Sequence, residues 1–339
     1  TSPDNAAIRI VEADEAVIAL AEGTANTLSD ASSYASTVKG NGPIAALASK
    51  ADLTIGGGGT LDVRGNSNDG ISSSDGLVVT GGTVKVTARD DAIRGQDYVV
   101  LAAGTFDLKA GNDGVKSDNK KNAGRGYVLV TGGTANVVAK SDALEATSDL
   151  IVTGGSVNAA GSEEGFEASK MLLAGGSATV TTSDDGLNAV NTATKPWMAI
   201  TGGDWTLNTE GDGFESDGDG VISGGKVTVY GPSAAGNGAV DVENGLTLSG
   251  GTLLAVGSVG MDEAPKTTAG QSAIKAQADI PAGGRLAVAD STGGEIAAYT
   301  SPKPAKSVVF SSPRIKKGDA YAVTVNGQKA AAATGGDYK

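Results

Sequence analysis

A Gly-Gly-Thr-like tripeptide returns along the middle of the chain about every 22 residues. Apolar residues alternate with polar ones on both sides of it, as Leu77 and Val79 do before Gly82 and Val84 and Val86 do after it. A third apolar position follows an acidic turn in each repeat. Alternation with a period of two indicates strands with one buried face. Three strands in about 22 residues predict one coil of a parallel β-helix, so the fold class is all-β.

The repeat also sets the expected domain organisation. About nine coils cover residues 53–262, and we expect residues 1–52 to form the opening coils or an N-terminal cap. Residues 263–339 break the period and hold most of the Pro residues. They predict a small C-terminal β-rich cap that covers the open end of the solenoid, followed by a flexible tail from Ala330. A leucine-rich repeat and a nonapeptide calcium roll lack support, because neither an Asn or Cys ladder nor a nine-residue period is present.

Composition excludes several classes of function. The chain has no Cys and no His, which excludes disulfides, thiol nucleophiles, Ser-His-Asp triads and nitrogen- or sulfur-ligated metals. Its net charge of −13 makes it a poor nucleic-acid binder, because binding would add to phosphate repulsion. No apolar run approaches the ~20 residues that span a bilayer. No signal peptide is visible at Thr1, so we expect a mature or trimmed form.

One turn of each repeat carries an acidic residue. Consecutive residues in a β-helix column lie ~4.8 Å apart, so stacked carboxylates repel one another unless a cation lies between them. Calcium prefers six to eight oxygen ligands, which neighbouring turns can supply. The column comprises Asp69, Asp91, Asp113, Asp142, Glu164, Asp185 and Asp212, and a second series after the inward apolar residue comprises Ser72, Arg94, Lys116, Glu145, Glu167, Asn188 and Glu215.

The alternative is that Asp-Gly is simply favourable turn chemistry. That alternative accounts for any single Asp, but Glu is not a turn former, and Glu occupies several of these positions. Residues 126–262 hold 17 acidic and 4 basic side chains, so this segment carries a charge of −13, the same as the whole chain. The concentration of acids favours calcium over turn chemistry.

Two insertions are expected to leave the solenoid at one corner, at residues 117–126 and 189–196. We predict that they wall a groove in which a basic patch and calcium together bind an anionic polymer, since both pair with carboxylates. Trp197 is predicted to stack on a sugar ring, whereas Trp205 occupies an inward slot and is expected in the core. A solvated loop is the alternative for the first insertion. The residues expected to contact carbohydrate are Arg94, Lys116, Lys120, Lys121, Arg125 and Trp197.

Several phrases together resemble a known family. They are AEGTANTLSD at 21–30, NDGI at 68–71, DDAIRG at 90–95, NDGVKSDN at 112–119, GPSAAGNGAVD at 231–241 and SPRIKKG at 312–318. The chain resembles the secreted bacterial carbohydrate-binding domain family, whose members are right-handed parallel β-helices similar to pectate lyases. The resemblance implies calcium binding, a secreted or cell-surface location, and binding of polygalacturonate and cellulose without established lyase activity. Two turns depart from the family pattern, DALE at 142–145 and EEGFE at 163–167.

The resemblance also implies calcium ligands at specific positions of this chain. It places them in the turns at 90–91 and 112–113, at Asp118, and at the matching acids of later coils. The full set of expected metal ligands is Asp90, Asp91, Asn112, Asp113, Asp118, Asp142, Glu145, Glu164, Glu167, Asp184, Asp185, Asp212 and Glu215.

Three functions remain open at this point. The first is non-catalytic, calcium-dependent binding of an acidic, uronate-containing polysaccharide. The second is a structural stalk or filament subunit stiffened by calcium. The third is pectate-lyase-like β-elimination, in which Arg94 or Lys116 would take the proton α to a uronate carboxylate. A catalytic Arg must lose its proton despite a pKa above about 12, so a basic residue in the ladder is weak support for a lyase.

Overall fold

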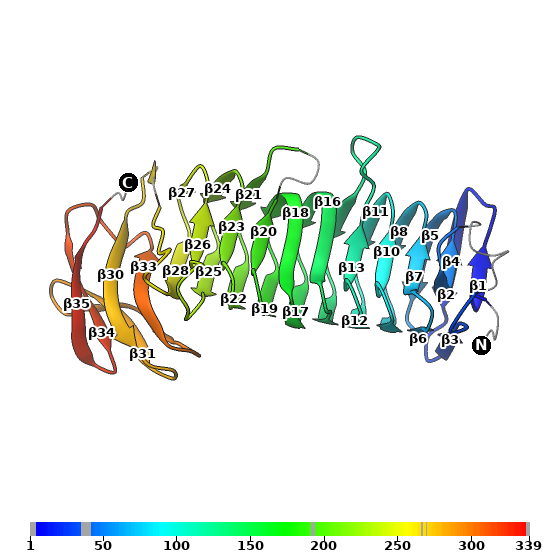
Figure 1. The fold of residues 1–339 in the computed structure, drawn as a ribbon, viewed down its shortest axis with the longest axis horizontal. Helices are drawn as coiled ribbons and strands as arrows, with labels where there is room; N and C mark the ends of the chain where they lie inside the picture. Colours follow the sequence, from blue (N-terminus) through cyan, green and yellow to red (C-terminus); the bar gives the residue numbers. More distant parts are fainter. Residues whose placement is uncertain (1–4, 35–41, 191–193, 266, 269, 337–339) are drawn as a thin grey trace. The chain divides into compact units, whose positions relative to one another are not determined.

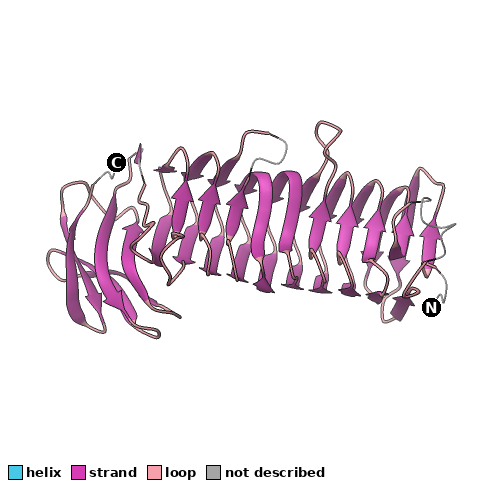
Figure 2. Cartoon of the chain, in the orientation of Figure 1, coloured by secondary structure: helices cyan, strands magenta, loops and turns pink. Residues whose placement is uncertain are grey.

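The computed structural model describes residues 5–34, 42–190, 194–265, 267–268 and 270–336. Every regular element within these residues is a β-strand, as Figure 2 shows by colour. The chain divides into two compact units, Thr1–Leu172 with Asn191–Lys195 (unit 1) and Leu173–Val190 with Pro196–Lys339 (unit 2). Among the described residues there is no helix with the length and hydropathy needed to cross a bilayer.

Unit 1 is made of short strands that follow one another around each coil (Figure 1). They are β1 (Ile8–Ile10), β2 (Glu15–Leu20), β3 (Ala25–Ser29), β4 (Ala45–Ser49), β5 (Asp52–Gly57), β6 (Thr60–Gly65), β7 (Asp69–Ser73), β8 (Gly76–Val79), β9 (Thr83–Ala88), β10 (Ile93–Gly95), β11 (Tyr98–Leu101), β12 (Thr105–Lys109), β13 (Val115–Ser117), β14 (Tyr127–Val130), β15 (Thr134–Val138), β16 (Asp142–Val152), β17 (Ser156–Ser162) and β18 (Glu164–Leu173).

These strands stack in three parallel ladders. One runs β4–β7–β10–β13–β16, the second β5–β8–β11–β14–β16, and the third β3–β6–β9–β12–β15–β17. Each coil contributes one strand segment to each ladder, which is the pattern of a right-handed parallel β-helix. The fold class predicted from the repeat is therefore confirmed.

The core of unit 1 consists of columns of equivalent side chains. Leu47, Ile71, Ile93, Val115 and Leu144 are paired in register from coil to coil, and all are fully buried. Burial of an aliphatic side chain contributes about 1.5–3 kcal/mol each, so every coil is stabilised mainly by its two neighbours.

The repeated Gly pair has a geometric cause. Gly104 and Gly133 have φ values of 117° and 83°, in the region that side chains with a Cβ rarely adopt. A Cβ on Gly104 would lie 2.8 Å from the carbonyl oxygen of Gly82, and one on Gly133 would lie 2.7 Å from that of Gly104. The turns therefore stack backbone on backbone, and the tripeptide marks this corner of the coil.

Unit 2 is built from coils of the same kind. Its parallel strands are β19 (Ser177–Thr182), β20 (Leu187–Ala189), β21 (Trp197–Ile200), β22 (Asp204–Thr209), β23 (Phe214–Ser216), β24 (Asp219–Ile222), β25 (Lys226–Tyr230), β26 (Val240–Val242), β27 (Leu246–Leu248), β28 (Thr252–Gly257) and β29 (Thr267–Thr268). The ladders are β19–β22–β25–β28, β20–β23–β26 and β21–β24–β27–β29. Trp205 is fully buried, and its Nε1 donates to the carbonyl oxygen of Gly202 at 2.7 Å, so its predicted core position is confirmed.

The last strands of unit 2 change direction. They are β30 (Ala273–Ile280), β31 (Arg285–Asp290), β32 (Glu295–Thr300), β33 (Ala305–Ser311), β34 (Ala320–Val325) and β35 (Gln328–Thr334). β33 pairs antiparallel with both β28 and β30, and β32–β31–β34–β35 form a separate antiparallel sheet. Phe310, Val308 and Leu286 belong to a common apolar core beneath these strands.

The structure differs from the expected flexible tail. Residues from Ala330 onward were expected to be disordered, but Gln328–Thr334 form β35 and pair with β34. The run of Ala residues carries little sequence signal for a strand, and the neighbouring strand supplies the hydrogen bonds that order it. Residues 337–339 of that tail lie outside the described residues.

Candidate functional site

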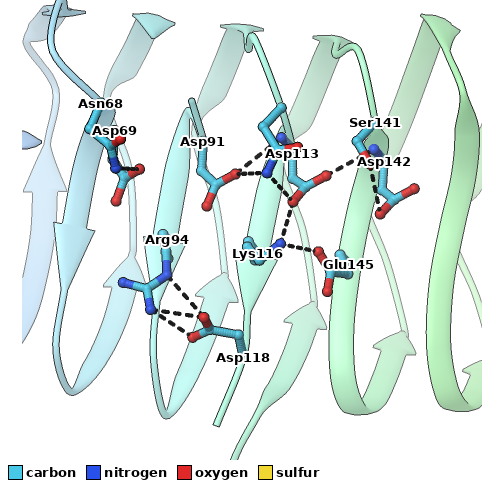
Figure 3. Close-up of polar contacts among 11 residues, drawn as sticks. Asn68, Asp69, Asp91, Arg94, Asp113, Lys116, Asp118, Ser141, Asp142 and Glu145 are labelled. Atoms are coloured by element: carbon cyan, nitrogen blue, oxygen red, sulfur yellow. Dashed lines mark hydrogen bonds and ion pairs between the residues drawn. The ribbon is translucent and has the colours of Figure 1, made fainter. Parts of the chain in front are cut away.

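The acidic column of unit 1 lies at the start of the β7–β10–β13–β16 ladder. Asp69 and Asp142 begin β7 and β16, while Asp91 and Asp113 lie two residues before β10 and β13. The in-register pairing of these strands places the four carboxylates at equivalent positions of consecutive coils, as Figure 3 shows. The predicted column is therefore present in the fold.

Asp91 and Asp113 each accept a backbone amide of the next coil with one carboxylate oxygen. The amide of Asp113 donates to Asp91 Oδ1 at 3.1 Å, and the amide of Asp142 donates to Asp113 Oδ1 at 3.0 Å. Asp is short enough to accept the amide of the next coil, which accounts for its choice at this turn. Turn chemistry is thus part of the explanation, and it accounts for one carboxylate oxygen of Asp91 and one of Asp113.

A lysine ammonium lies inside the column at one coil. Lys116 Nζ is 2.5 Å from Asp113 Oδ2 and also donates to Glu145 Oε2. The side chains of Lys116, Asp113 and Glu145 are 18%, 1% and 18% exposed. Burial works to lower the pKa of Lys116, but the charges of Asp113 and Glu145 outweigh it and raise that pKa. Burial likewise works to raise the pKa of Asp113, yet its bonds with Glu145 and Lys116 hold that pKa below its usual value.

The second predicted base of this region is also held as a cation. Arg94 Nη2 lies 2.9 and 2.8 Å from the two carboxylate oxygens of Asp118, and Nε lies 3.3 Å from Oδ2 (Figure 3). Burial opposes the charge, but the pairing with Asp118 raises the pKa of Arg94. Neither Arg94 nor Lys116 is therefore poised to accept a proton, which leaves the lyase alternative without support from the residues named for it.

Three groups of acids in unit 1 come close enough to share a cation. Within each group, ligand oxygens lie within 4.8 Å of one another, and the groups are Asp69–Asp90–Asp91, Asp113–Asp142–Glu145 and Asp142–Glu164–Glu167. The middle group already contains the Lys116 ammonium. Asp69 belongs to the first group, although the family resemblance did not name it as a ligand. Its position in the repeat, equivalent to that of Asp91, was enough to identify it as a candidate ligand.

Several carboxylates of these groups have raised pKa values. Burial, followed by the charge of Asp91, raises the pKa of Asp69 to about 7. Burial and then Asp113 raise the pKa of Asp91 to about 6. The pKa of Asp142 rises to about 9, first through burial and then through the charges of Asp113, Glu167, Glu164 and Glu145. Such shifts arise where like charges are stacked away from water without enough positive charge among them.

Unit 2 repeats the arrangement with Asp185, Asp212 and Glu215, whose ligand oxygens also lie within 4.8 Å of one another. The amide of Asp212 donates to Asp185 Oδ1 at 2.6 Å, and the amide of Gly238 donates to Asp212 Oδ1 at 2.5 Å. Burial and then contact with Asp185 raise the pKa of Glu215 to about 9. The paired column positions in this region are Asn188 and Asp241, so the ladder supplies no basic residue next to Glu215.

These groups fit a hard divalent ion. Calcium–oxygen distances of about 2.3–2.6 Å place two ligand oxygens up to about 5 Å apart, which matches the 4.8 Å limit of each group. All donors are carboxylate oxygens, and buried carboxylates with raised pKa values gain from a cation. The structure brings together the predicted ligands Asp90, Asp91, Asp113, Asp142, Glu145, Glu164, Glu167, Asp185, Asp212 and Glu215.

Three other predicted ligands are placed differently. Asn112 Nδ2 donates to Asp91 and Asp113 at 2.9 and 3.0 Å, so its amide acts as a donor between the two acids. Asp118 pairs with Arg94 instead of joining an acidic group. Asp184 is next to Asp185 in the chain but belongs to none of the acidic groups found among the described residues.

The residues predicted to bind carbohydrate are divided between the two units. In unit 1, Lys120 and Lys121 are exposed, and Arg125 lies 3.5 Å from Asp97 with its guanidinium 5.8 Å from the centre of the Tyr98 ring. Trp197 belongs to unit 2, where it is half-buried on β21. The second insertion includes residues 191–193, which lie outside the described residues, so the groove between the insertions stays a prediction.

A family model described as "Carbohydrate-binding domain-containing protein" matches residues 1–195 and 160–301. A protein of that description from Acetivibrio thermocellus is 40% identical over 89 residues, which are 26% of this chain and 31% of the relative. A solved polysaccharide lyase-like protein from C. thermocellum, a gadolinium derivative, has 36% identity and a TM-score of 0.45 over 46% of this chain and 64% of that one. The chain thus spans about a third of the curated relative and under two thirds of the solved chain.

Proposed function

We propose that this chain binds an acidic polysaccharide of the polygalacturonate type in a calcium-dependent, non-catalytic manner. The chain belongs to the carbohydrate-binding domain-containing protein family. The family supplies the general class of ligand. The charge of the ligand and the role of calcium come from the acidic column.

One observation carries the calcium part of this proposal. Buried and half-buried carboxylates gather in four groups whose oxygens lie within 4.8 Å, and three of these groups contain an acid whose pKa is raised to about 9. Asp142, Glu164 and Glu167 would hold one ion, and Asp185, Asp212 and Glu215 would hold another. Asp69, Asp90 and Asp91 are the third candidate set. When bound, calcium supplies positive charge that a uronate carboxylate can share.

The proposal extends to location. Extracellular calcium modules commonly bind with dissociation constants of about 10⁻⁴–10⁻³ M, which suits the calcium levels outside cells. We propose that the sites of this chain, which mix buried and half-buried carboxylates, belong to this weak class. We therefore propose that the protein works in secreted form or at the cell surface.

Titration calorimetry with polygalacturonate tests the proposal. The titration is run in millimolar calcium and repeated with a chelator, and fully methyl-esterified pectin serves as the uncharged control. We expect affinity for polygalacturonate at least ~10-fold higher with calcium, since charge-assisted contacts contribute about 1.5–3 kcal/mol each. We expect no binding of the esterified polymer.

Two outcomes would contradict parts of the proposal. Equal affinity with and without calcium would remove the role of the metal. A rise in ultraviolet absorbance from unsaturated uronides during incubation with polygalacturonate would show β-elimination and contradict the non-catalytic assignment.

A further inference from the structure

A groove lies on the outer face of the β6–β9–β12 ladder of unit 1, and at Arg89 it comes next in the chain to Asp90 of the acidic groups. It has a volume of about 590 Å³ and is lined by side chains from β6, β9 and β12 and from the turns that follow β6 and β9. Four of the lining residues are basic and two are acidic. They are Arg64, Lys85, Arg89, Lys109, Asp62 and Asp107.

The charges of the groove are set in rows by strand register. Arg64, Thr87 and Lys109 are paired across the three strands, and all three are exposed. Adjacent parallel strands are about 4.8 Å apart, so the backbones of Arg64 and Lys109 are separated by roughly 10 Å. Arg89 follows the end of β9 and adds a third cation beside this row. A second row, next to the first, has side chains of alternating charge.

That second row consists of Asp62, Lys85 and Asp107. Its carboxylates can accept hydrogen bonds from hydroxyl groups, and the first row can pair with anions. A polymer with dense negative charge, such as a nucleic acid, would be repelled by Asp62 and Asp107. A chain that carries one carboxylate and several hydroxyl groups per residue fits both rows.

The cations of this groove also differ from those of the acidic column in their availability. Arg94 and Lys116 are enclosed by Asp118, Asp113 and Glu145. In the part of the chain that the structure describes, Arg89 and Lys109 make no ion pair, and Arg64 reaches Asp62 only at 3.9 Å while 64% of its side chain is exposed. An incoming carboxylate therefore finds available partners here.

We propose that this groove is a binding subsite for two carboxylates of a uronate-containing glycan that lies across β6, β9 and β12, with Arg64 and Lys109 as the two anchoring cations and Arg89 assisting. The subsite rests on the proposed function for its class of ligand, but it needs no metal. The calcium sites and this groove then contribute separately to affinity.

The double variant Arg64→Gln/Lys109→Gln tests the subsite. Its affinity for oligogalacturonates is measured by titration calorimetry with chelator and with calcium, next to the wild-type protein. We expect weak binding by the wild type in chelator, and at least a ~10-fold loss in the double variant under both conditions. The matched control is Lys226→Gln, another exposed cation on an outer strand face, in unit 2, which should bind as the wild type does.

The outcomes separate this inference from the proposed function. Calcium-dependent binding that the double variant leaves unchanged would overturn the groove alone. Binding that calcium does not affect but the double variant loses would support the groove and overturn the metal role, whereas a wild-type protein that does not bind would overturn both. Equal affinity of the groove for dextran sulfate would overturn its assignment to uronates. Thermal melting of the variant checks folding, and because both side chains are exposed we expect the melting temperature of the wild type.

Discussion

Residues 53–125 and residues 126–262 build the same kind of coil with different charge. The first segment carries nine acidic and nine basic side chains, and the second carries 17 acidic and 4 basic ones. In the first segment Arg94 and Lys116 occupy the column position that follows the inward apolar residue, and both are paired with carboxylates. In the second segment the same position is filled by Glu145, Glu167, Asn188 and Glu215.

The difference shows two solutions to one electrostatic problem. Any column of carboxylates at a spacing of about 4.8 Å needs positive charge. The first segment supplies much of it from its own side chains, which stay in place whatever the solvent contains. In the second segment the ladder places Asn188 and Asp241 beside Glu215, and under the proposed function calcium supplies the positive charge at that group.

The largest expected effect comes from removing the internal cation. Lys116→Met leaves Asp113 and Glu145 buried without their partner, and breaking a buried pair in this way typically costs about 3–5 kcal/mol. In chelator we expect a loss of ~3 kcal/mol by thermal or denaturant unfolding. Calcium should restore part of it, because the first segment would then resemble the second. Lys226→Met, whose lysine side chain is 49% exposed, is the control and should change stability by under ~1 kcal/mol. A loss that calcium does not reduce would contradict this reading of the two segments.

The next largest effect is the dependence of folding stability on pH when calcium has been removed. The pKa values of Asp142 and Glu215 are about 9 in the folded protein, against 3.8 and 4.5 as ordinary values. Between these limits the folded state binds more protons than the unfolded state, so stability falls as pH rises. In chelator the melting temperature should therefore decrease across this window. Saturating calcium should flatten the curve and add about 2–3 kcal/mol at a concentration near 100 times its dissociation constant. A melting temperature in chelator that is constant or rises with pH would refute the assignment.

The smallest expected effect is on stability, and it has opposite signs in chelator and in calcium. Glu215→Gln replaces an acid that must take up a proton when the chain folds at neutral pH, so in chelator it should raise the melting temperature by about 2 °C. In calcium it removes a ligand, so the variant should gain less stability from the metal than the wild type. Glu243→Gln, an exposed acid on the following turn, is the control and should show neither change. A variant of Glu215 that responds to calcium like the wild type would remove this residue from the metal site.

Sequence periodicity was enough to predict the column but not its internal pairing. The repeat places Asp91, Asp113 and Asp142 at equivalent turns because backbone register follows directly from the spacing of inward apolar residues. The same logic predicted that Trp205 is buried. It did not predict that Asp118 reaches back to Arg94, because the direction of a long side chain after the end of a strand depends on local geometry.

The groove on β6, β9 and β12 was missed for a related reason. Arg64, Thr87 and Lys109 point outward, where no packing constraint imposes a repeat, so each looks like an ordinary surface residue. Only the register between strands shows that they form a row. Outward positions at equal places in consecutive coils are therefore the pattern to search for in chains of this kind.

The antiparallel pairing of β28 with β33 has a consequence for self-association. A parallel coil presents a free edge onto which a further coil, from any copy of the chain, can add in the same direction. In unit 2 that edge of β28 is taken by a strand of opposite direction. No further parallel coil can therefore add to β28. A truncated form that lacks Ala305–Ser311 would be expected to polymerise end to end.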